Sequence, residues 1–198
     1  MWNTLYRESP RRWSGRVNIR LVEVATQLTP GRALDLGCGE GADAIWLAAR
    51  DWQVVAVDIS DEALRRAAED AGELVSRIDF QHHDLTRSFP EGQFDLVSAQ
   101  FLQSPLSWDR YALLRQAAGS VAAGGLFLLV DHGSGPPSSA HRHQGMDFPA
   151  PQEVLDGMAL PDSQWQLVRA ESVDREVVGP DGVPAVILDN VILLRRHG

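Results

Sequence analysis

The 198-residue sequence predicts an α/β protein with a mainly parallel sheet. Short apolar runs alternate with longer segments of helical periodicity, as expected of strand–helix–strand units. Residues 54–57, Val-Val-Ala-Val, are apolar throughout, which is typical of a strand covered by helices on both faces. With 44% hydrophobic and 23% charged residues the chain can fill one core, so we expect a single domain over residues 1–198.

Residues 32–130 are expected to form alternating strands and helices. Ser60 can cap the second helix, and Asp61 and Glu62 suit the positive first turn of that helix. Gly124-Gly125 is expected to form a turn before the fifth strand. The expected strands are 32–36, 54–57, 76–81, 94–99 and 126–130. The expected helices are 42–50, a segment that starts at residue 61, and 108–118.

The last third of the chain differs in character. Residues 133–151 are rich in proline, serine and glycine and have no periodicity, which predicts a long functional or disordered loop. Pro151 suits the first turn of a short helix that ends near Met158. The extended runs 164–178 and 184–195 are joined by Gly-Pro-Asp-Gly, and this pattern predicts a terminal β-hairpin.

The composition excludes several kinds of chemistry. A formal net charge of −9 argues against a bulk electrostatic grip on nucleic acid. All basic residues are arginine, and a chain without lysine forms neither a Schiff base with pyridoxal nor a Walker-type phosphate loop. The single cysteine, Cys38, excludes an internal disulfide and a zinc site of several thiolates. Without a membrane-length apolar run or a signal-peptide pattern, we expect a cytoplasmic protein that does not contact membranes.

The strongest chemical signal is a glycine-rich loop, Gly37-Cys38-Gly39-Glu40-Gly41, that leaves the first strand and enters a helix. Glycines allow sharp turns and close approach of a ligand, and the helix N-terminus beyond them offers unpaired N–H groups. Gly37, Gly39 and Ala42 also fit the dinucleotide-binding spacing, so the glycines alone do not choose a cofactor. Cys38 is interpreted as a small residue tolerated in the turn rather than a nucleophile.

Three acidic residues sharpen this signal, because each follows or ends a predicted strand. Asp35 lies beside the loop, where a carboxylate repels a pyrophosphate and attracts an ammonium or sulfonium group. Asp58 ends the second strand and can accept hydrogen bonds from both ribose hydroxyls. Asp84 follows the third strand and can accept from an adenine amine, with an ordinary solvated loop acid as the alternative. Together they predict a ligand with an amino-acid cation, a ribose and an adenine.

The motifs LDLGCGEG, AVDIS, HDL, FDLVSAQFL and AAGGLFLLV resemble those of the class I S-adenosylmethionine-dependent methyltransferases. The resemblance covers residues 32–132, about half of the chain, and the terminal hairpin is similar to the last two strands of that family. Within the family the sequence most resembles small bacterial enzymes related to tellurite-resistance and thiopurine methyltransferases. The resemblance implies a Rossmann-like seven-stranded sheet in the order 3-2-1-4-5-7-6, with strand 7 antiparallel and helices on both faces.

The same resemblance implies a division of labour along the chain. Residues 1–30 would form an N-terminal arm or lid, 31–132 the cofactor-binding core, 133–151 a substrate loop, and 152–198 the helix and hairpin. Asp35 and the glycine loop would hold the methionine portion, Asp58 the ribose and Asp84 the adenine edge. The residues that it implies for S-adenosyl-L-methionine are Trp13, Asp35, Gly37, Cys38, Gly39, Gly41, Asp58, Ile59, Asp84, Leu85 and Gln100.

Methyl transfer from a sulfonium is an in-line displacement, and a base is needed only when the acceptor must lose a proton. His132, His141 and His143 are candidates for that base or for substrate contacts. Solvated loop histidines are the alternative for His141 and His143. A metal site that also includes Asp147 is a further alternative, but no metal is predicted because a third ligand is not evident.

The expected acceptor is a small molecule. Methyl transfer would convert the cofactor to S-adenosyl-L-homocysteine. The Asn-Pro-Pro-aromatic run of the family's DNA and protein amide-nitrogen methyltransferases is absent after residues 94–99. No nucleic-acid partner is expected, and the protein would be a monomer or a homodimer. Two other hypotheses stay open: a non-catalytic S-adenosylmethionine-binding protein of the same fold, and an NAD(P)-dependent oxidoreductase.

Overall fold

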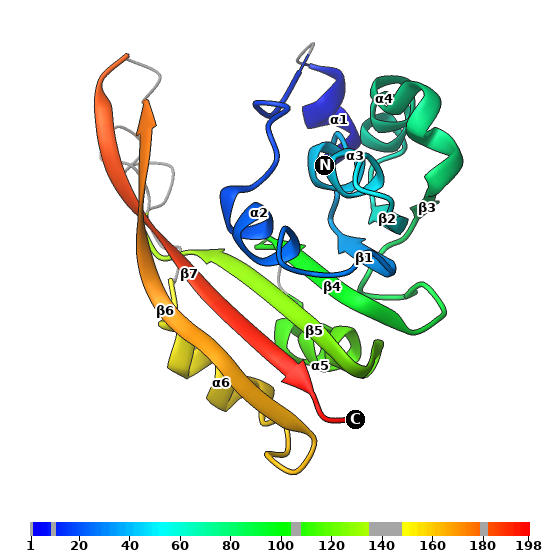
Figure 1. Ribbon diagram of the computed structural model, residues 1–198. Coiled ribbons are helices and arrows are strands. Elements are labelled where there is room, and N and C mark those ends of the chain that lie inside the picture. Colours follow the sequence, from blue (N-terminus) through cyan, green and yellow to red (C-terminus); the bar gives the residue numbers. More distant parts are fainter. Residues whose placement is uncertain (1, 9–10, 104–107, 135–147, 179–181) are drawn as a thin grey trace.

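A seven-stranded sheet with helices on both faces forms the centre of the molecule (Figure 1). The computed structural model describes residues 2–8, 11–103, 108–134, 148–178 and 182–198. The strand order is β3-β2-β1-β4-β5-β7-β6, which confirms the expected order. Neighbouring strands from β3 to β5 pair in parallel, whereas β7 is antiparallel to both β5 and β6.

Most strands lie within a few residues of their expected positions. The strands are β1 (Arg32–Leu36), β2 (Gln53–Asp58), β3 (Ile78–His82), β4 (Phe94–Gln100), β5 (Val121–His132), β6 (Trp165–Val178) and β7 (Pro184–Arg196). The helices are α1 (Trp2–Arg7), α2 (Ile19–Ala25), α3 (Ala42–Ala48), α4 (Asp61–Ala71), α5 (Arg110–Gly119) and α6 (Pro151–Met158), with a short 3-10 helix, η1 (Gly72–Arg77). The predicted terminal hairpin is therefore confirmed.

Side-chain caps explain where two of the helices begin. The Ser60 hydroxyl accepts a hydrogen bond from the Ala63 N–H at 3.2 Å, as expected from the sequence. Asp109 caps α5 in the same way, accepting from the Ala112 N–H at 2.9 Å, so this helix begins two residues later than predicted. Pro151 is the first residue of α6, where its missing N–H costs no helical hydrogen bond.

The sequence prediction was wrong at Gly124-Gly125. These glycines lie inside β5, which runs from Val121, instead of forming a turn before it. Gly124 has a φ of +78°, and the pairing with β4 jumps from Phe94–Val121 to Leu96–Leu126. The glycines thus make an irregular excursion within one strand, which the apolar pattern of the sequence could not distinguish from a turn.

Two apolar layers cover the sheet, one on each face. On one face, side chains of β1, β4, β5 and β7 pack against α2 and α3. On the other face, α5 and α6 pack over the same strands. The sequence assigned no helix to residues 1–30, yet α1 and α2 form there, and α2 buries Leu21 and Val24 against the first layer.

Alternation along the strands places six side chains on one face, near the edge of the sheet at which the parallel strands end. Val54 and Ala56 lie in the first apolar layer, so Asp58, two residues on, points the same way. The same alternation from Ala33, Leu96, Val130 and Val191 orients the rest of the row. In order across the sheet, the row is Asp58, Asp35, Gln100, His132, Asp189 and Arg175. Among the described helices, none is both long enough and apolar enough to span a membrane.

Gly41 combines a left-handed backbone with a close neighbour on another helix. Its φ is +79°, and a Cβ there would lie 2.7 Å from the Ala67 Cβ of α4. We expect Gly41→Ala to lower the free energy of unfolding by about 2–4 kcal/mol, from left-handed backbone strain and overpacking. Gly182→Ala is the control, because Gly182 has a φ of +76° and open space around it, and it should cost about 1 kcal/mol. Equal costs in urea unfolding would contradict the packing argument.

Candidate functional site

The glycine loop between β1 and α3 is the centre of the candidate site. Gly37, Gly39 and Gly41 all have positive φ, at +72°, +54° and +79°. The N–H groups of Gly37 and Cys38 donate to the Val57 carbonyl at 2.8 and 2.9 Å, which ties the loop to the end of β2. Left-handed glycines at every second position turn the chain sharply enough to leave the strand and start the helix.

Asp58, at the end of β2, holds the loop in place. It is 8% exposed, and its Oδ2 accepts from the Gly39 N–H at 2.9 Å while Oδ1 accepts from the Ser60 N–H at 2.9 Å. Burial raises the pKa of the Asp58 carboxyl, although these backbone hydrogen bonds favour the charged form. Ile59 follows directly and has a partly exposed side chain.

Asp35 is the least satisfied polar group of the site. It is 2% exposed and accepts a hydrogen bond from the Ala44 N–H, but within the described part of the chain its Oδ2 has no hydrogen-bond partner. Burial, then the nearby Asp43 and Asp58, raise the pKa of Asp35 well above its usual value. Burial also raises the pKa of Asp43 to about 6, and Asp43 Oδ1 accepts from the Asn18 N–H at 2.7 Å. An uncompensated buried carboxyl group of this kind favours a cationic ligand.

Gln100 continues the row at the end of β4. Its Nε2 donates to the Ser98 hydroxyl at 2.8 Å, and its buried Oε1 has no partner among the described residues. Asp35 and Gln100 therefore present two buried acceptor oxygens on one face of the sheet, on adjacent strands. Buried acceptors without donors are rare in folded proteins, so this pair is a candidate contact for a ligand that donates hydrogen bonds.

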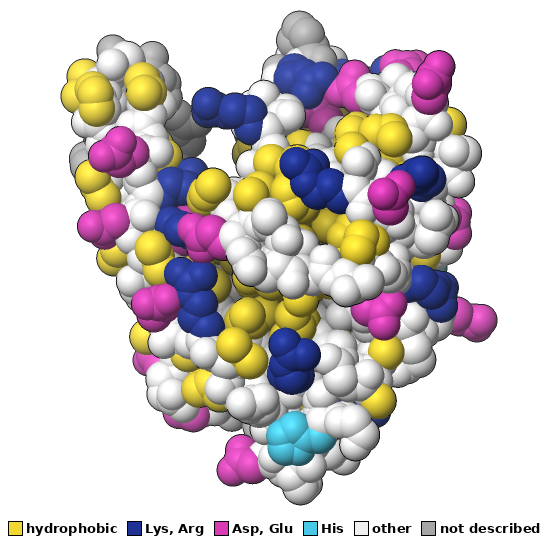
Figure 2. All heavy atoms as spheres, viewed as in Figure 1, with side chains coloured by type: hydrophobic (Ala, Val, Ile, Leu, Met, Phe, Trp, Pro, Cys, Tyr) yellow, Lys and Arg dark blue, Asp and Glu magenta, His cyan; other side chains and the backbone are white. Residues whose placement is uncertain are grey.

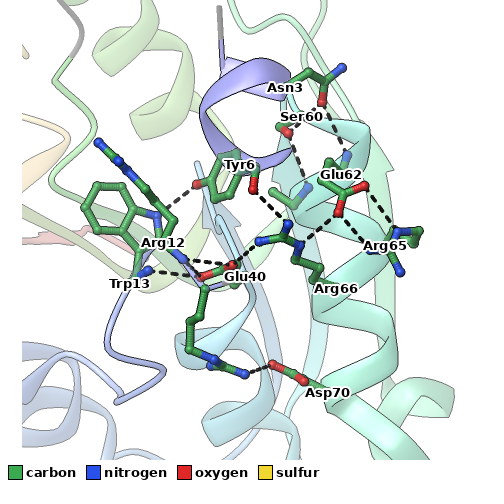
Figure 3. Close-up of polar contacts among 12 residues, drawn as sticks. Asn3, Tyr6, Arg12, Trp13, Glu40, Ser60, Glu62, Arg65, Arg66 and Asp70 are labelled. Carbon is green, nitrogen blue, oxygen red and sulfur yellow. Dashed lines mark hydrogen bonds and ion pairs between the residues drawn. The ribbon is translucent and has the colours of Figure 1, made fainter. Parts of the chain in front are cut away.

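The N-terminal arm packs against the loop, as Figure 3 shows for its polar contacts. The Trp13 indole N–H donates to the Tyr6 hydroxyl at 2.9 Å, and a Cβ on Gly39 would lie 3.0 Å from that hydroxyl. Trp13 is 53% exposed, whereas Tyr6 is buried. Burial, reinforced by the charge of Asp58, raises the pKa of Tyr6. The structure thus brings Trp13 to the glycine loop.

Glu40 fastens this arm, and the sequence analysis did not single it out. One of its carboxylate oxygens accepts from the backbone N–H groups of Arg12 and Trp13, each at 3.0 Å, and the other accepts from Arg66 Nη1 at 3.0 Å. These hydrogen bonds hold the pKa of Glu40 below its usual value despite partial burial. The available signal was its place within the loop motif, but nothing in the sequence paired it with backbone groups 27 and 28 residues away.

Asp84 and Leu85 lie just beyond β3, and the His83 N–H donates to the Asp58 carbonyl at 3.0 Å. Asp84 Oδ1 accepts from the Thr86 hydroxyl at 2.6 Å and from the Thr86 N–H at 3.1 Å, and these bonds lower its pKa. Its carboxylate is therefore engaged by its own turn. Leu85 packs at the border of the second apolar layer.

The remaining predicted residues are Cys38, His132, His141 and His143. Burial raises the pKa of the Cys38 thiol, which makes it a poor nucleophile and agrees with the interpretation of Cys38 as a turn residue. His132 ends β5, and its ring stacks on Phe101 with 4.3 Å between ring centroids. The predicted base or substrate residues His141 and His143 lie outside the described residues, as does Asp147.

Comparisons of the sequence with known proteins find methyltransferases. Residues 33–125 match the family model of a methyltransferase domain. The chain is 32% identical over 136 residues to the 27-O-demethylrifamycin SV methyltransferase of Amycolatopsis mediterranei, covering 64% of this chain and 50% of that protein. A shorter match, 40% identical over 83 residues, is to the ribosomal protein L11 methyltransferase of Neisseria gonorrhoeae, covering 41% of this chain and 27% of that protein. The chain thus spans half the length of the first relative, and less of the second.

Two solved structures share the fold. One, from work on the conversion of a disulfide bond into a thioacetal group during echinomycin biosynthesis, superposes with a TM-score of 0.72 and 24% identity, covering 99% of this chain and 91% of that chain. The other is the N-methyltransferase NodS of Bradyrhizobium japonicum in complex with S-adenosyl-L-homocysteine, with a TM-score of 0.64 and 18% identity, covering 90% and 84% of the two chains. At these identities the likeness concerns the fold.

The buried charge of Asp35 leads to a prediction about stability. Because its pKa is raised in the folded protein, Asp35 opposes folding above that pKa, and the cost disappears as the pH falls and the carboxyl group is protonated. Asp35→Asn keeps an oxygen for the Ala44 N–H and removes the charge. We expect it to raise the free energy of unfolding without ligand by about 1–3 kcal/mol at pH 8, and by less at pH 5. A variant less stable than the wild type at pH 8 in urea unfolding would contradict this.

Proposed function

We propose that this chain, which belongs to the class I S-adenosylmethionine-dependent methyltransferases, transfers a methyl group from S-adenosyl-L-methionine to a small acceptor molecule. The observation that carries the proposal is the buried Asp35 carboxyl group with an unpartnered oxygen beside a glycine loop. This group suits a ligand that brings an ammonium group and other N–H or O–H donors. It does not suit a pyrophosphate, because the negative charge of that group would lie close to the carboxyl groups of Asp35, Asp43 and Asp58.

The residues present fit this cofactor. Asp35 and the Gly37–Gly41 loop would receive the methionine portion, because the carboxylate offers an acceptor and the glycines allow close approach. Asp58 would accept hydrogen bonds from the ribose hydroxyls, and Ile59, Asp84 and Leu85 would border the adenine. Gln100 Oε1 would face the methyl-transfer position. Trp13, fixed by Tyr6 and Glu40, would cover the loop from the N-terminal side.

When bound, the cofactor supplies an activated methyl group on a sulfonium that already carries positive charge. The tasks left to the protein are alignment and exclusion of water. The row of strand ends would align the two reactants, since Asp35 and Gln100 lie on adjacent strands and His132 on the next strand. The arm that Glu40 holds would limit access of water. His132 would accept a proton when the acceptor is an alcohol or phenol.

A small acceptor is favoured by three observations. The net charge of −9 opposes nucleic acid, and the sequence after β4 is Phe101-Leu102-Gln103 instead of an Asn-Pro-Pro-aromatic run. The relative that aligns over 136 residues is named for a rifamycin derivative, whereas the relative that aligns over 83 residues is named for a ribosomal protein. The two alternatives, a non-catalytic binding protein and an NAD(P)-dependent oxidoreductase, predict different outcomes in the next two experiments.

Calorimetry separates the cofactors. We expect the wild-type chain to bind S-adenosyl-L-homocysteine and to show no comparable affinity for NAD. Asp58→Asn should weaken binding of S-adenosyl-L-homocysteine about 10-fold or more, because a charged acceptor for hydroxyl groups is lost. Asp61→Asn is the matched control, since Asp61 lies three residues on and is largely exposed, and it should change affinity less than twofold. Preference for NAD would instead support the oxidoreductase.

Turnover separates an enzyme from a binding protein. The wild-type chain should release S-adenosyl-L-homocysteine from S-adenosyl-L-methionine in the presence of at least one class among thiols, amines, phenols and inorganic anions. At saturating acceptor, His132→Asn should slow transfer to phenols about 100-fold and leave kcat for thiolates within a few-fold, because only phenols need a base. Cofactor binding without turnover across all four classes would favour the non-catalytic alternative.

A further inference from the structure

A second group of side chains lies on the same face as the candidate cofactor site, toward the β6–β7 hairpin. Phe101 follows Gln100 and has a φ of +53°, an uncommon backbone conformation for a bulky residue. Its ring stacks on His132 with an interplanar angle of 22°, and the Arg175 guanidinium carbon lies 5.2 Å from the Phe101 ring centroid. Strain of this kind concentrates at functional sites.

Among the described residues, only one nitrogen of the Arg175 guanidinium, Nε, donates hydrogen bonds within the protein. Its Nε–H donates to both oxygens of Asp189, at 3.0 and 2.9 Å. Within the described ranges, Nη1 and Nη2 make no hydrogen bond or ion pair, and the side chain is 27% exposed. The planar end of the guanidinium, which is the part that recognises carboxylates in pairs of hydrogen bonds, is therefore open.

Arg175 is not the only cation that compensates the negative charge of Asp189. This aspartate is completely buried, and Arg20 Nε lies 3.5 Å from its Oδ2. Arg20 Nη2 also donates to the Asp174 carbonyl at 2.8 Å, so Arg20 is fixed between α2 and the hairpin. Two arginines thus converge on one buried carboxylate, and a ligand that engages Arg175 leaves Asp189 with a cation beside it.

The neighbouring Arg169 shows the contrast. It lies on the same strand, six residues before Arg175, and its side chain is exposed to a similar degree. Arg169 forms ion pairs with Glu171 through Nε and with Glu23 through Nη1, so its terminal nitrogens already have one carboxylate partner. An arginine that only fastens β6 to its surroundings has this pattern, and Arg175 does not. In Figure 2, arginine side chains follow the line where the hairpin meets the rest of the molecule.

Position along the sheet connects Arg175 with the reaction. His132 pairs with Asp189 across β5 and β7, and Asp189 pairs with Val173 across β7 and β6. Arg175 is two residues beyond Val173, so it lies on the same face and further toward the carboxyl edge. A molecule that reaches Gln100 from the hairpin side would pass over His132, Phe101 and Arg175.

We propose that the acceptor carries a carboxylate or similar oxyanion, that the open end of Arg175 binds this group, and that the Phe101–His132 stack supports the rest of the acceptor. This inference rests on the proposed function and makes Arg175 a specificity-determining residue. The ion pair with Asp189 fixes the guanidinium before binding, which reduces the entropy lost when an anion is bound.

The test uses the full chain saturated with S-adenosyl-L-homocysteine and matched probe pairs: acetate and acetamide, benzoate and benzamide, 4-mercaptobenzoate and 4-mercaptobenzamide. We expect the wild type to bind the carboxylate of at least one pair about 10-fold more tightly than its amide. Arg175→Gln should remove that preference and leave the amide affinity within twofold. Arg175→Lys should retain part of the preference, and Arg169→Gln is the matched control that should retain all of it.

Three results are decisive. No carboxylate preference in the wild type for any pair overturns the proposal, and this measurement needs no variant, so it stands if Arg175→Gln fails to fold. Equal loss of carboxylate and amide binding in folded Arg175→Gln also overturns it, because a structural role predicts that result. If the wild type fails to bind S-adenosyl-L-homocysteine, the proposed function itself fails. Normal binding of S-adenosyl-L-homocysteine without carboxylate preference contradicts only the assignment of Arg175.

Discussion

Buried negative charge at the carboxyl ends of β1 and β2 is the constraint on which the candidate site depends. Asp35, Asp43 and Asp58 come from a strand end, a helix start and a second strand end, and burial raises the pKa of all three. Such an arrangement costs folding free energy, since each carboxyl group loses hydration and Asp35 also faces the charges of Asp43 and Asp58. A ligand that supplies a cation and hydroxyl donors recovers part of that cost on binding, and this converts an unstable feature of the empty fold into affinity.

Most strands and helices of the core could be predicted from the sequence, because the signals for them are local. Apolar strands, the Ser60 cap and the terminal hairpin each need only a few neighbouring residues to be recognised. Gly124 was misassigned because a bulge inside a strand and a turn before one share the same glycine pattern. Helices α1 and α2 were missed because each is only six or seven residues long, and such short helices depend on tertiary packing more than on intrinsic propensity.

The candidate site divides in the same way. The positions of Asp35, Asp58 and the loop glycines could be predicted, because strand ends and glycine turns leave local signals in the sequence. Glu40 could not, since its partners are backbone groups of a distant arm that only the folded chain brings near. For Asp84, the sequence indicated its position beyond a strand but not that Thr86 donates to its Oδ1. Spacing in a sequence places a carboxylate at a sheet edge without showing which donor reaches it first.

Along that sheet edge the electrostatic character changes from one half to the other. The β2–β1 half presents carboxyl groups with raised pKa, while the β7–β6 half presents Arg175 and Arg20 around one buried aspartate. Gln100, neutral and with an unpartnered oxygen, lies between them on β4. Opposite charges in the two halves would hold a cationic donor and an anionic acceptor apart at their charged ends while their reactive atoms meet in the middle. An arrangement of this kind orients both molecules by their extremities, which allows a neutral centre to serve a displacement that needs alignment more than proton transfer.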